Sequence, residues 1–497
     1  MSAPSSQTLE SSSTFRRFSD GQPVGDVIPF FHGGQYHLFI LTPPSGSLHF
    51  PERLVTTWRH ITSTDLVHWV ERGDAIEPGA VKDFDGGGIW TGSAIFLDGI
   101  FHIYYTGHGT DHTQVICHAT STDGLTWQKA DGNPVLAAPH GYEAKDWRDP
   151  FVFWHADENC YWMLITARSS MATAPNRGLI AVSRSLDLSE WSAPETFYST
   201  FLTHAPECPE IFELDGKWVL GYSRFTDRRG TVYRVADHPS GPYRTLGPEA
   251  PDAANWYAAK GLSTPDGRRI SFGWVPDHDP ELVNPANPWL WAGDLALPRE
   301  LHVNADGEVH MSLPPEIRSQ FGADLPFHWA ADDGKWSSSG ETIKVSAKGD
   351  VAIRTLTLEQ PAIDSVLSVQ FAELDDIHQV GLIVHTTEKL DSGIGIFYFP
   401  RTGNVRAVDM RAPVGEVSAE YETMFGQYAP IAEHDLSHSR DAMRFEVVTR
   451  GDVVEAFVGD VCCLTYRTKG TGTPAAALVA VDGTATITEY SWRNFGL

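Results

Sequence analysis

The stretch LDGIFHIYY at residues 97–105 decides the fold, because it is one copy of a unit that recurs through the N-terminal part of the chain. Each copy is a tight turn followed by an apolar strand. The other copies are HGGQYHLFIL (32–41), ADENCYWMLI (156–165), LDGKWVLGY (214–222) and PDGRRISFGW (265–274), and the turn residues Gly34, Gly99, Asn159, Gly216 and Gly267 are 65, 60, 57 and 51 residues apart. A period of this length, with several strands per copy, is typical of the blades of a β-propeller. We therefore predict five blades.

A second repeat alternates with the first. Its copies are STDLVHW (63–69), STDGLTW (121–127) and SLDLSEW (185–191), each an Asp-containing turn that ends on a tryptophan. Helical periodicity is almost absent, and strands rich in Val, Ile, Phe, Tyr and Trp alternate with Gly, Asp and Pro turns. The pattern predicts β-structure throughout this part of the chain.

The pattern changes near residue 310. LPPEIRSQFG (313–322) reads as a short linker with a helical turn, and later runs such as VAIRTLTL (351–358) and AMRFEVVT (442–449) alternate with period two, as in an antiparallel sandwich. We predict an all-β protein with an N-terminal five-bladed β-propeller at residues 15–312, a linker at 313–335 and a C-terminal β-sandwich at 336–497.

Charge limits the classes of partner. The 497 residues include 37 Lys and Arg against 64 Asp and Glu, a formal charge of -27. Such a charge repels nucleic-acid phosphates and anionic lipid, although a solvated acidic surface also accounts for it. No apolar run approaches the roughly 18 to 20 residues that cross a bilayer. We therefore predict a neutral ligand, no nucleic-acid partner and no membrane span.

The N-terminus and the cysteines bear on the compartment. The first 15 residues, MSAPSSQTLESSSTF, lack the basic and apolar regions of a secretory signal, which predicts a cytoplasmic protein, or a secreted one if a leader has been removed. The five cysteines are odd in number and form no CxxC or Cys/His spacing. Free thiols and no bound metal are therefore expected.

Three acidic residues occupy equivalent places in the first repeat. In a propeller the first strand of each blade lines the central channel. Asp26, Asp149 and Glu207 each lie 8 to 10 residues before the turn of their own copy, as does Tyr257. The sequence thus predicts a ring of carboxylates at one end of the channel. A turn or capping role for Asp149 is the alternative, and Glu210 is a rival of Glu207, although strand alternation sends residues 207 and 210 to opposite faces.

Several strings mark the N-terminal part in order. They are GDVIPFFHGGQYHLFIL (25–41), TTWRHITSTDLVHW (56–69), IWTGSAIF (89–96), WRDPFVFW (147–154), ECPEIF (207–212), NWYAAK (255–260), GRRISFGW (267–274) and WAGDLALPREL (291–301). In this order they resemble the landmarks of glycoside hydrolase family 32, the invertases, inulinases, levanases and related fructosyltransferases, and DVVEAFV (452–458) is similar to a late strand of that family's sandwich. The resemblance covers nearly the whole chain.

The resemblance implies a role for each acid. Asp26 would be the nucleophile, Asp149 the stabiliser of the charge on the sugar ring and Glu207 the general acid/base. It also implies a small-molecule carbohydrate substrate and no cofactor, and it leaves monomer and homo-oligomer undecided. The chain departs from the family's opening motif WMNDPNG, because VGDVIPF puts Gly25 in place of the asparagine and Val27 in place of the proline.

The chemistry independently requires two carboxyls with different pKa values. Cleavage of a ketofuranoside passes through an oxocarbenium-like state, in which one carboxylate attacks the anomeric carbon while a protonated carboxyl assists the leaving oxygen. Burial beside other acids would raise the pKa of Glu207, whereas Asp26 must stay ionised. Arg148 is expected to pair with an acid or to bind a substrate hydroxyl.

Further residues at strand starts are predicted to bind the sugar. These substrate-binding candidates are Trp58, Trp90, Thr91, Arg148, Tyr257 and Trp291. Aromatic rings can stack on a furanose, but a propeller also needs tryptophans between its blades for packing. Both roles stay open for the aromatic candidates.

Three functions fit the sequence. The first is a retaining β-fructofuranosidase or fructanase that acts on sucrose, fructo-oligosaccharides or fructan. The second is a fructosyltransferase of the levan fructotransferase or difructose anhydride type with the same acids, supported by the altered VGDVIPF motif. The third is an inverting arabinan-type hydrolase or a sugar-binding propeller without activity.

Overall fold

The computed structural model describes residues 12–226, 229–279, 289–331, 333–387, 389–390, 392–410, 431–436, 438–468 and 475–496. Within these ranges the regular structure is almost entirely strand, with one short α-helix, α1 (Pro315–Arg318). The chain divides into two compact units: the first ends at His302, and the second combines residues 245–255 with the chain from Val303 onward. The prediction of an all-β fold is confirmed.

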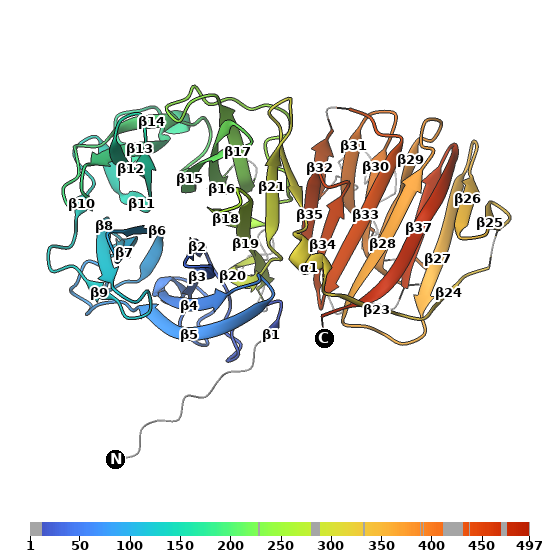
Figure 1. Ribbon diagram of the computed structural model, residues 1–497, viewed down its shortest axis with the longest axis horizontal. Coiled ribbons are helices and arrows are strands. Elements are labelled where there is room, and N and C mark those ends of the chain that lie inside the picture. Colours follow the sequence, from blue (N-terminus) through green and yellow to red (C-terminus); the bar gives the residue numbers. More distant parts are fainter. Residues whose placement is uncertain are drawn as a thin grey trace, which may run out of the picture. The chain divides into compact units, whose positions relative to one another are not determined.

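The first unit consists, in its described residues, of five sheets arranged around a centre (Figure 1), as predicted for a five-bladed propeller. The first blade contains β2 (Val27–His32), β3 (Gln35–Thr42), β4 (Thr57–Ser63) and β5 (His68–Ile76), with β1 (Ser12–Ser13) at its outer edge. The second blade contains β6 (Ile89–Leu97), β7 (Ile100–His108) and β8 (Gln114–Ser121), and both β9 (Gln128–Lys129) and β10 (Leu136–Ala137) pair with β8. The third blade contains β11 (Tyr142–His155), β12 (Cys160–Ser169), β13 (Gly178–Ser185) and β14 (Glu195–Ser199). The fourth contains β15 (Glu207–Leu214), β16 (Lys217–Arg224) and β17 (Gly230–Ala236). The fifth contains β18 (Tyr257–Ser263), β19 (Arg269–His278), β20 (Trp289–Leu295) and β21 (Arg299–Val303). The first strand of each blade is the innermost one.

The second repeat forms the outer turns of three blades. Asp65 Oδ1 accepts hydrogen bonds from the backbone N–H groups of Val67 (2.9 Å) and His68 (2.8 Å). In the other two copies Asp123 and Asp187 accept the same pair of bonds from the residues two and three positions later. These backbone bonds lower the pKa of Asp123 and Asp187 to about 2. The repeated aspartate therefore has a structural role as an Asx turn.

The N-terminal segment joins the first and last blades. Val24 and Gly293 exchange two backbone hydrogen bonds of 2.8 and 2.9 Å. The buried carboxylate of Asp294 binds Arg16 at 2.8 Å and also binds Arg17. A carboxylate taken out of water is stable only when it is paired, so these two arginines are what make its burial possible.

The second unit contains two facing antiparallel sheets, and the core lies between them. One sheet has the order β25 (Trp336–Ser339), β26 (Thr342–Ser346), β37 (Thr484–Phe495), β28 (Asp364–Ala372), β33 (Ala442–Arg450), β34 (Val453–Val458) and β35 (Cys462–Arg467). The other has the order β24 (Phe327–Trp329), β27 (Val351–Leu358), β36 (Ala475–Val481), β29 (Gln379–Thr386), β30 (Ile394–Phe399), β31 (Asn404–Asp409) and β32 (Ala432–Asp435). This arrangement matches the predicted sandwich.

The segment 313–335, expected to be a linker, contains more structure than its sequence suggested. Besides α1 it holds β23 (Phe321–Asp324), which pairs with β37, and β24, which pairs with β27. These strands are only four and three residues long, too short for a period-two pattern to be visible. The segment is therefore part of both sheets of the sandwich.

Two further expectations concern single residues and short segments. All five cysteines are buried free thiols, as predicted. Among the described helices, none has the length and apolar character that a membrane crossing requires. Residues 1–11, on which the prediction of the compartment partly rests, lie outside the described residues.

Candidate active site

The innermost strands of four blades share a backbone irregularity where the predicted site residues lie. Their pairing with the next strand shifts register after Trp90, Arg148, Glu207 and Tyr257. At three of these shifts a residue other than glycine has a left-handed backbone, namely Asp149 (φ 57°), Cys208 (φ 52°) and Ala258 (φ 50°). A bulge re-aims side chains, and such a residue costs on the order of 1–3 kcal/mol. The strain therefore marks this level of the channel as a site.

Asp26 lies directly before β2, and two donors fix its carboxylate. Trp274 Nε1 donates to Oδ1 at 2.9 Å, and the hydroxyl of Thr91 donates to Oδ2. The thiol of Cys208 is 3.7 Å from the same Oδ2. Both donors stabilise the ionised form of Asp26, which is the form that a nucleophile needs.

Asp149 lies within β11 and is almost fully buried. Its Oδ2 accepts hydrogen bonds from the hydroxyl of Thr166 (3.1 Å) and from the backbone N–H of Cys208 (2.9 Å). Its own N–H donates to the hydroxyl of Thr106 at 2.8 Å. Because Cys208 contacts both Asp26 and Asp149, these two carboxylates are neighbours.

Arg148 connects the second and third acids. Its Nη2 donates to Glu207 Oε1 at 3.0 Å, and its Nε is 3.6 Å from Asp149 Oδ2. Arg148 Nη1 also donates to Asp146 (2.8 Å) and to Gln114 (3.3 Å), and these two hydrogen bonds fix the position of the guanidinium. Arg148 and Asp149, in the middle of β11, therefore belong to a cluster of paired charges.

Glu207 has a second donor in Tyr257. The hydroxyl of Tyr257, the first residue of β18, donates to Glu207 Oε2. Glu210 lies elsewhere: it is fully buried, and its Oε2 accepts bonds from Arg269 Nη2 (2.5 Å) and from the N–H of Gly261 (2.8 Å). Of the two glutamates, only Glu207 contacts the Arg148 network.

Burial raises the pKa values of two of the acids. The pKa of Asp26 is raised to about 7, chiefly by burial and further by the charges of Asp149 and Glu207, while the bonds from Thr91 and Trp274 lower it. Burial also raises the pKa of Glu207, and the neighbouring guanidinium opposes this effect. The sequence led us to expect a raised pKa for Glu207 alone. Both acids are raised because they lie in the same water-poor channel.

The aromatic candidates divide into two groups. Trp58 is fully buried, and its indole N–H donates to the carbonyl of Trp90 at 3.0 Å. The prediction that Trp58 contacts the substrate is therefore not supported, because its ring packs in the core between the first two blades. Trp90 is partly exposed, and its ring stacks on His108, with ring centroids 4.2 Å apart. Thr91 and Tyr257 are buried, and their hydroxyls donate to Asp26 and Glu207.

Trp291 explains the glycine at position 25. A Cβ atom on Gly25 would lie 2.5 Å from Trp291 Cη2 and 2.9 Å from the carbonyl oxygen of Leu41. The indole thus fills the space beside the backbone in which a side chain at position 25 would begin. Trp291 also packs edge-on against Trp274, with centroids 5.9 Å apart. An apolar wall therefore stands where the family motif would put a polar amide.

Four residues near the acids were not found from the sequence as site residues. Trp274, the last residue of the fifth copy of the first repeat, donates to Asp26. Cys208 contacts both Asp26 and Asp149. The guanidinium of Arg229 lies 4.9 Å from the ring centroid of Tyr257, and the buried ammonium of Lys260 donates to the carbonyl of Gly92 at 2.6 Å. No sequence spacing indicates that Arg229 and Lys260 lie near the acids. Among the four residues, only Trp274 has an informative position, because it ends a copy of the first repeat.

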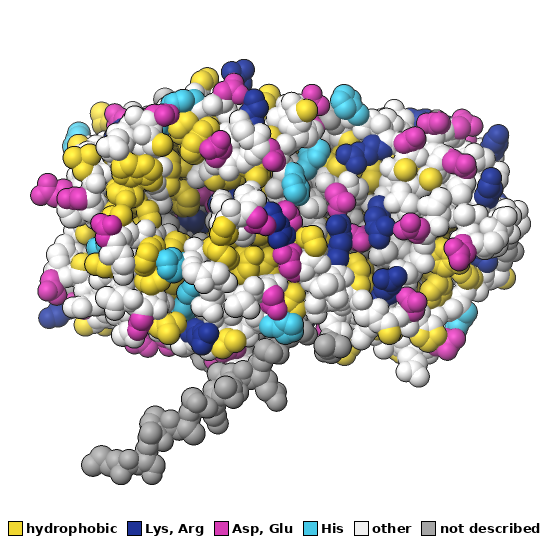
Figure 2. Space-filling view, viewed as in Figure 1, with side chains coloured by type: hydrophobic (Ala, Val, Ile, Leu, Met, Phe, Trp, Pro, Cys, Tyr) yellow, Lys and Arg dark blue, Asp and Glu magenta, His cyan; other side chains and the backbone are white. Residues whose placement is uncertain are grey.

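The surface of the first unit is hollowed among the blades (Figure 2). Basic side chains are visible inside the hollow, and hydrophobic side chains surround it. In the part of the chain that the structure describes, no group of three or more His, Cys, Asp and Glu side chains has the arrangement of a metal site. The candidate site thus combines buried carboxylates with aromatic residues, and paired carboxylates are the kind of group that glycoside hydrolases use.

Sequence comparison specifies the family. Residues 27–314 match the family model described as the glycosyl hydrolases family 32 N-terminal domain, and the chain belongs to this family. It is 30% identical over 311 residues to a raffinose invertase of Escherichia coli, covering 58% of this chain and 61% of that protein. It is also 30% identical over 321 residues to the insoluble isoenzyme 1 of β-fructofuranosidase from Oryza sativa subsp. indica, covering 58% and 53%. The match therefore spans little more than half the length of these relatives.

Solved structures confirm the fold over the whole chain. The sucrose-6-phosphate hydrolase of Lactobacillus gasseri superposes with a TM-score of 0.72 at 19% identity, covering 99% of this chain and 94% of that one. Fructan 1-exohydrolase IIa of Cichorium intybus gives a TM-score of 0.72 at 17% identity, covering 99% and 98%. The propeller predicted from the repeats and the sandwich predicted from the alternating strands are thus the family's fold.

Proposed function

We infer that the protein is a retaining glycoside hydrolase that cleaves β-fructofuranosidic linkages in sucrose, fructo-oligosaccharides or fructan. The observation that carries this inference is the set of contacts that joins the three acids. Cys208 contacts Asp26 through its thiol and Asp149 through its N–H, and Arg148 donates a hydrogen bond to Glu207 and forms an ion pair with Asp149. Relatives named as a raffinose invertase and as β-fructofuranosidases support the same substrate class. A small-molecule fructoside is the proposed partner, and no cofactor takes part.

The first half of the reaction needs a proton donor and a nucleophile. Glu207, whose pKa is raised by burial, is the proposed proton donor, and it gives its proton to the glycosidic oxygen as the bond to the anomeric carbon breaks. Asp26 attacks the anomeric carbon and forms a covalent fructosyl ester, while the leaving sugar departs with the proton from Glu207. The negative charge of Asp149 stabilises the positive charge that develops on the sugar ring. Hydrogen bonds from Thr166 and Cys208 hold the Asp149 carboxylate in position.

The second half uses the same residues in reverse. The carboxylate of Glu207 is now held by Arg148 and Tyr257, and it takes a proton from water, whose oxygen attacks the anomeric carbon. The ester bond to Asp26 breaks, fructose leaves, and Glu207 is protonated again. Both donors stabilise the ionised form of Glu207, so they lower the barrier to giving up its first proton.

Transfer to a sugar hydroxyl is the second candidate, and Gly25 with Trp291 favours it. An apolar ring in place of a polar side chain changes the wall of the channel beside the nucleophile. A hydroxyl of a second sugar, or of the same chain, would then replace water in the second half-reaction. A difructose anhydride would be the product of the intramolecular case.

Product analysis tests these alternatives. The chain is incubated with sucrose, inulin and levan, the products are identified by chromatography, and the Asp26→Asn variant serves as the inactive control. Free fructose as the only product supports hydrolysis, and fructosyl oligomers or anhydrides support transfer. Proton NMR of the first-formed anomer tests retention, because an inverting enzyme would release the α-anomer first. Turnover by Asp26→Asn equal to that of the unmodified chain would overturn the assignment of the nucleophile.

A further inference from the structure

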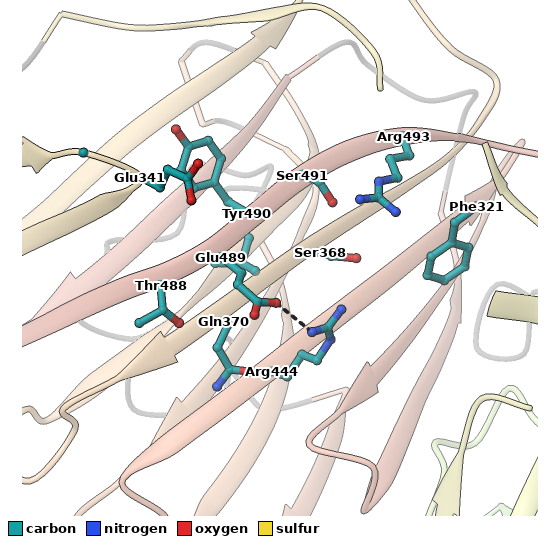
Figure 3. A pocket seen from close by; sticks show the side chains of 12 residues that line it. Phe321, Glu341, Ser368, Gln370, Arg444, Thr488, Glu489, Tyr490, Ser491 and Arg493 are labelled. Atoms are coloured by element: carbon teal, nitrogen blue, oxygen red, sulfur yellow. Dashed lines mark hydrogen bonds and ion pairs between the residues drawn. The ribbon is translucent and has the colours of Figure 1, made fainter. Parts of the chain in front are cut away.

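A groove of about 560 Å³ on the sandwich illustrates how charged side chains outside the candidate active site are paired (Figure 3). Arg444 donates to Glu489 at 3.1 Å in this groove, as the dashed line in Figure 3 shows, and Arg493 donates to Asp324 at 3.2 Å. Each guanidinium is compensated by a carboxylate of the same unit. The two pairs therefore need no ligand to explain them.

Lys260 is a buried cation without such a partner. It belongs to β18, the innermost strand of the fifth blade, and it is only 1% exposed. Within the described residues its ammonium forms no ion pair, and its hydrogen bond is the 2.6 Å bond to the carbonyl of Gly92. An ammonium taken out of water is costly unless it is paired, so a lysine at this position needs a reason beyond packing.

The side chain of Lys260 reaches the innermost strands of two other blades. Its Nζ binds Gly92 in β6 and lies 5.2 Å from the ring centroid of Phe151 in β11. The strands β6, β11 and β18 each face the centre of the propeller (Figure 1). The ammonium is therefore inside the channel, next to the strands that carry Thr91 and Asp149.

Gly92 connects the lysine to the proposed nucleophile. The pairing of β6 with β7 shifts register immediately before Gly92, which leaves Thr91 as the extra residue of a bulge. Thr91 donates its hydroxyl to Asp26, and its carbonyl accepts a hydrogen bond from Thr106 at 2.8 Å. The bond from Lys260 holds the next carbonyl of the same bulge. The lysine thus helps to fix the backbone that aims Thr91 at Asp26.

The charged surroundings of Lys260 include the acids of the site. Burial lowers the pKa of Lys260, and neighbouring acidic groups oppose this effect, namely Cys208, Glu210, Asp149 and Asp26. Cys208 stays an uncharged thiol, because burial raises its pKa well above the ordinary value. Coupling between two charges is reciprocal, so the ammonium favours the ionised form of each carboxyl as much as that carboxylate favours the ammonium.

Asp26 is the carboxylate of this group that lacks a cation of its own. Glu210 accepts a hydrogen bond from Arg269 at 2.5 Å, and Asp149 is 3.6 Å from Arg148. Within the described residues Asp26 forms no ion pair, and its carboxylate contacts a hydroxyl, an indole N–H and a thiol, which are all uncharged. A further cation is needed if Asp26 and Asp149 are to be ionised together.

We propose that Lys260 is a positioning residue for Asp26: its ammonium supplies the positive charge that Asp26 otherwise lacks and, through Gly92, holds Thr91 within hydrogen-bond reach. The role of Asp26 as nucleophile rests on the proposed function. The coupling between Lys260 and Asp26 is a property of the folded chain and needs no substrate. Loss of the ammonium should therefore keep Asp26 protonated up to a higher pH.

Unfolding of four chains tests the coupling without any substrate. The unmodified chain, Lys260→Met, Asp26→Asn and the double variant are unfolded in urea at pH 8 and at pH 5. Asp26 is ionised at pH 8, because burial raises its pKa only to about 7. At this pH Lys260→Met should reduce the folding equilibrium constant about fivefold more in the unmodified chain than in Asp26→Asn, as expected for a pKa shift of about one unit. At pH 5 Asp26 is protonated, and the two reductions should be equal.

Additive effects of the two substitutions at both pH values would overturn the proposal. If Lys260→Met alone does not fold at pH 8, adding Asp26→Asn should restore folding, because it removes the uncompensated carboxylate. A double variant that is equally unfolded would also overturn the proposal.

The pH dependence of kcat/KM for sucrose separates the charge of Lys260 from its hydrogen bond. A nucleophile must be ionised, so activity rises as the pH passes through the pKa of Asp26. Lys260→Met should move this ascending limb to higher pH by about one unit. Lys260→Gln keeps an N–H donor and removes the charge, so it should move the limb by the same amount. A limb that moves in Lys260→Met and not in Lys260→Gln would overturn the role of the charge.

Lys129→Met is the matched control. The ammonium of Lys129, in the outer strand β9, also donates to a backbone carbonyl, that of Glu77 at 2.7 Å, but it is paired with Asp85. This variant should leave the pH profile unchanged and show no coupling to Asp26→Asn. No hydrolysis of sucrose by the unmodified chain would overturn the proposed function, whereas the unfolding experiment would still decide the role of Lys260.

Discussion

Replacing Tyr257 by phenylalanine removes one hydroxyl from the site and tests whether Glu207 is the proton donor. That hydroxyl donates to Glu207 Oε2, and the bond lowers the pKa of Glu207 against the larger effect of burial. A hydrogen bond to a charged group is worth about 1.5–3 kcal/mol, and 1.36 kcal/mol corresponds to one pKa unit. Loss of the bond should therefore raise the pKa of Glu207 by about 1–2 units.

The measurement is the pH dependence of kcat/KM for sucrose. A general acid must be protonated, so activity falls as the pH rises through the pKa of Glu207. In Tyr257→Phe this descending limb should move to higher pH by about 1–2 units, and kcat near pH 7 should fall because the carboxylate formed in the first step loses a donor. A limb that stays in place, or that moves to lower pH, would refute the assignment of Glu207 as the acid.

Tyr104→Phe is the matched control for this experiment. Tyr104 is also fully buried, and its hydroxyl donates to the backbone carbonyl of Leu188, away from the acids. Its loss should cost about 1 kcal/mol of unfolding free energy and leave the pH profile unchanged. A shift of the profile in both variants would show that any buried hydroxyl affects the rate, and the specific role of Tyr257 would be lost.

Three further substitutions test other contacts of the site. Asp26→Asn should increase the free energy of unfolding by about 1–3 kcal/mol at pH 8 and by almost nothing at pH 4. Burial raises the pKa of Asp26 from 3.8 to about 7, so the folded protein bears the cost of the buried charge at pH 8 and not at pH 4. Urea unfolding at both pH values measures the effect, and an effect independent of pH contradicts the prediction. Arg148→Met should abolish turnover and reduce stability by about 3–5 kcal/mol, because it leaves buried carboxylates unpaired; thermal unfolding and kcat measure the two losses, and a fully active variant contradicts the network. Gly25→Asn should cost about 1–3 kcal/mol, because its side chain collides with Trp291; Trp291→Ala in the same chain should recover part of this loss, and denaturant unfolding that shows additive losses excludes the clash.

The blades were predictable because their signal is local and repeated. A turn residue followed by an apolar strand appears five times, and each copy predicts the same hairpin without knowledge of the others. The short strands β23 and β24 were not predictable, because three or four residues carry no pattern and their place is decided by the open edges of β37 and β27. Long-range pairing thus determines what a short segment becomes.

The acids were predictable by position, but their surroundings were not. Counting from the turns brought Asp26, Asp149 and Glu207 together, because each acid lies 8 to 10 residues before the turn of its own copy. Trp58 was predicted to contact a sugar because it lies at a strand start in one of the landmark strings, whereas its indole packs between the first two blades. Position along a strand gives the level in the channel, and only packing decides which way a large ring turns.

Strand alternation separates Glu207 from Glu210, but β15 is not a regular strand at this point, because it has a bulge between the two residues. The left-handed Cys208 changes the direction of the backbone between them. As a result the N–H of Cys208 reaches Asp149 and its thiol reaches Asp26, two contacts that a regular strand would not make from one residue. The strained residue is therefore the piece that assembles the acids into one site. Relieving it with Cys208→Gly, which accepts the left-handed backbone, should preserve the hydrogen bond to Asp149 and lose the thiol contact.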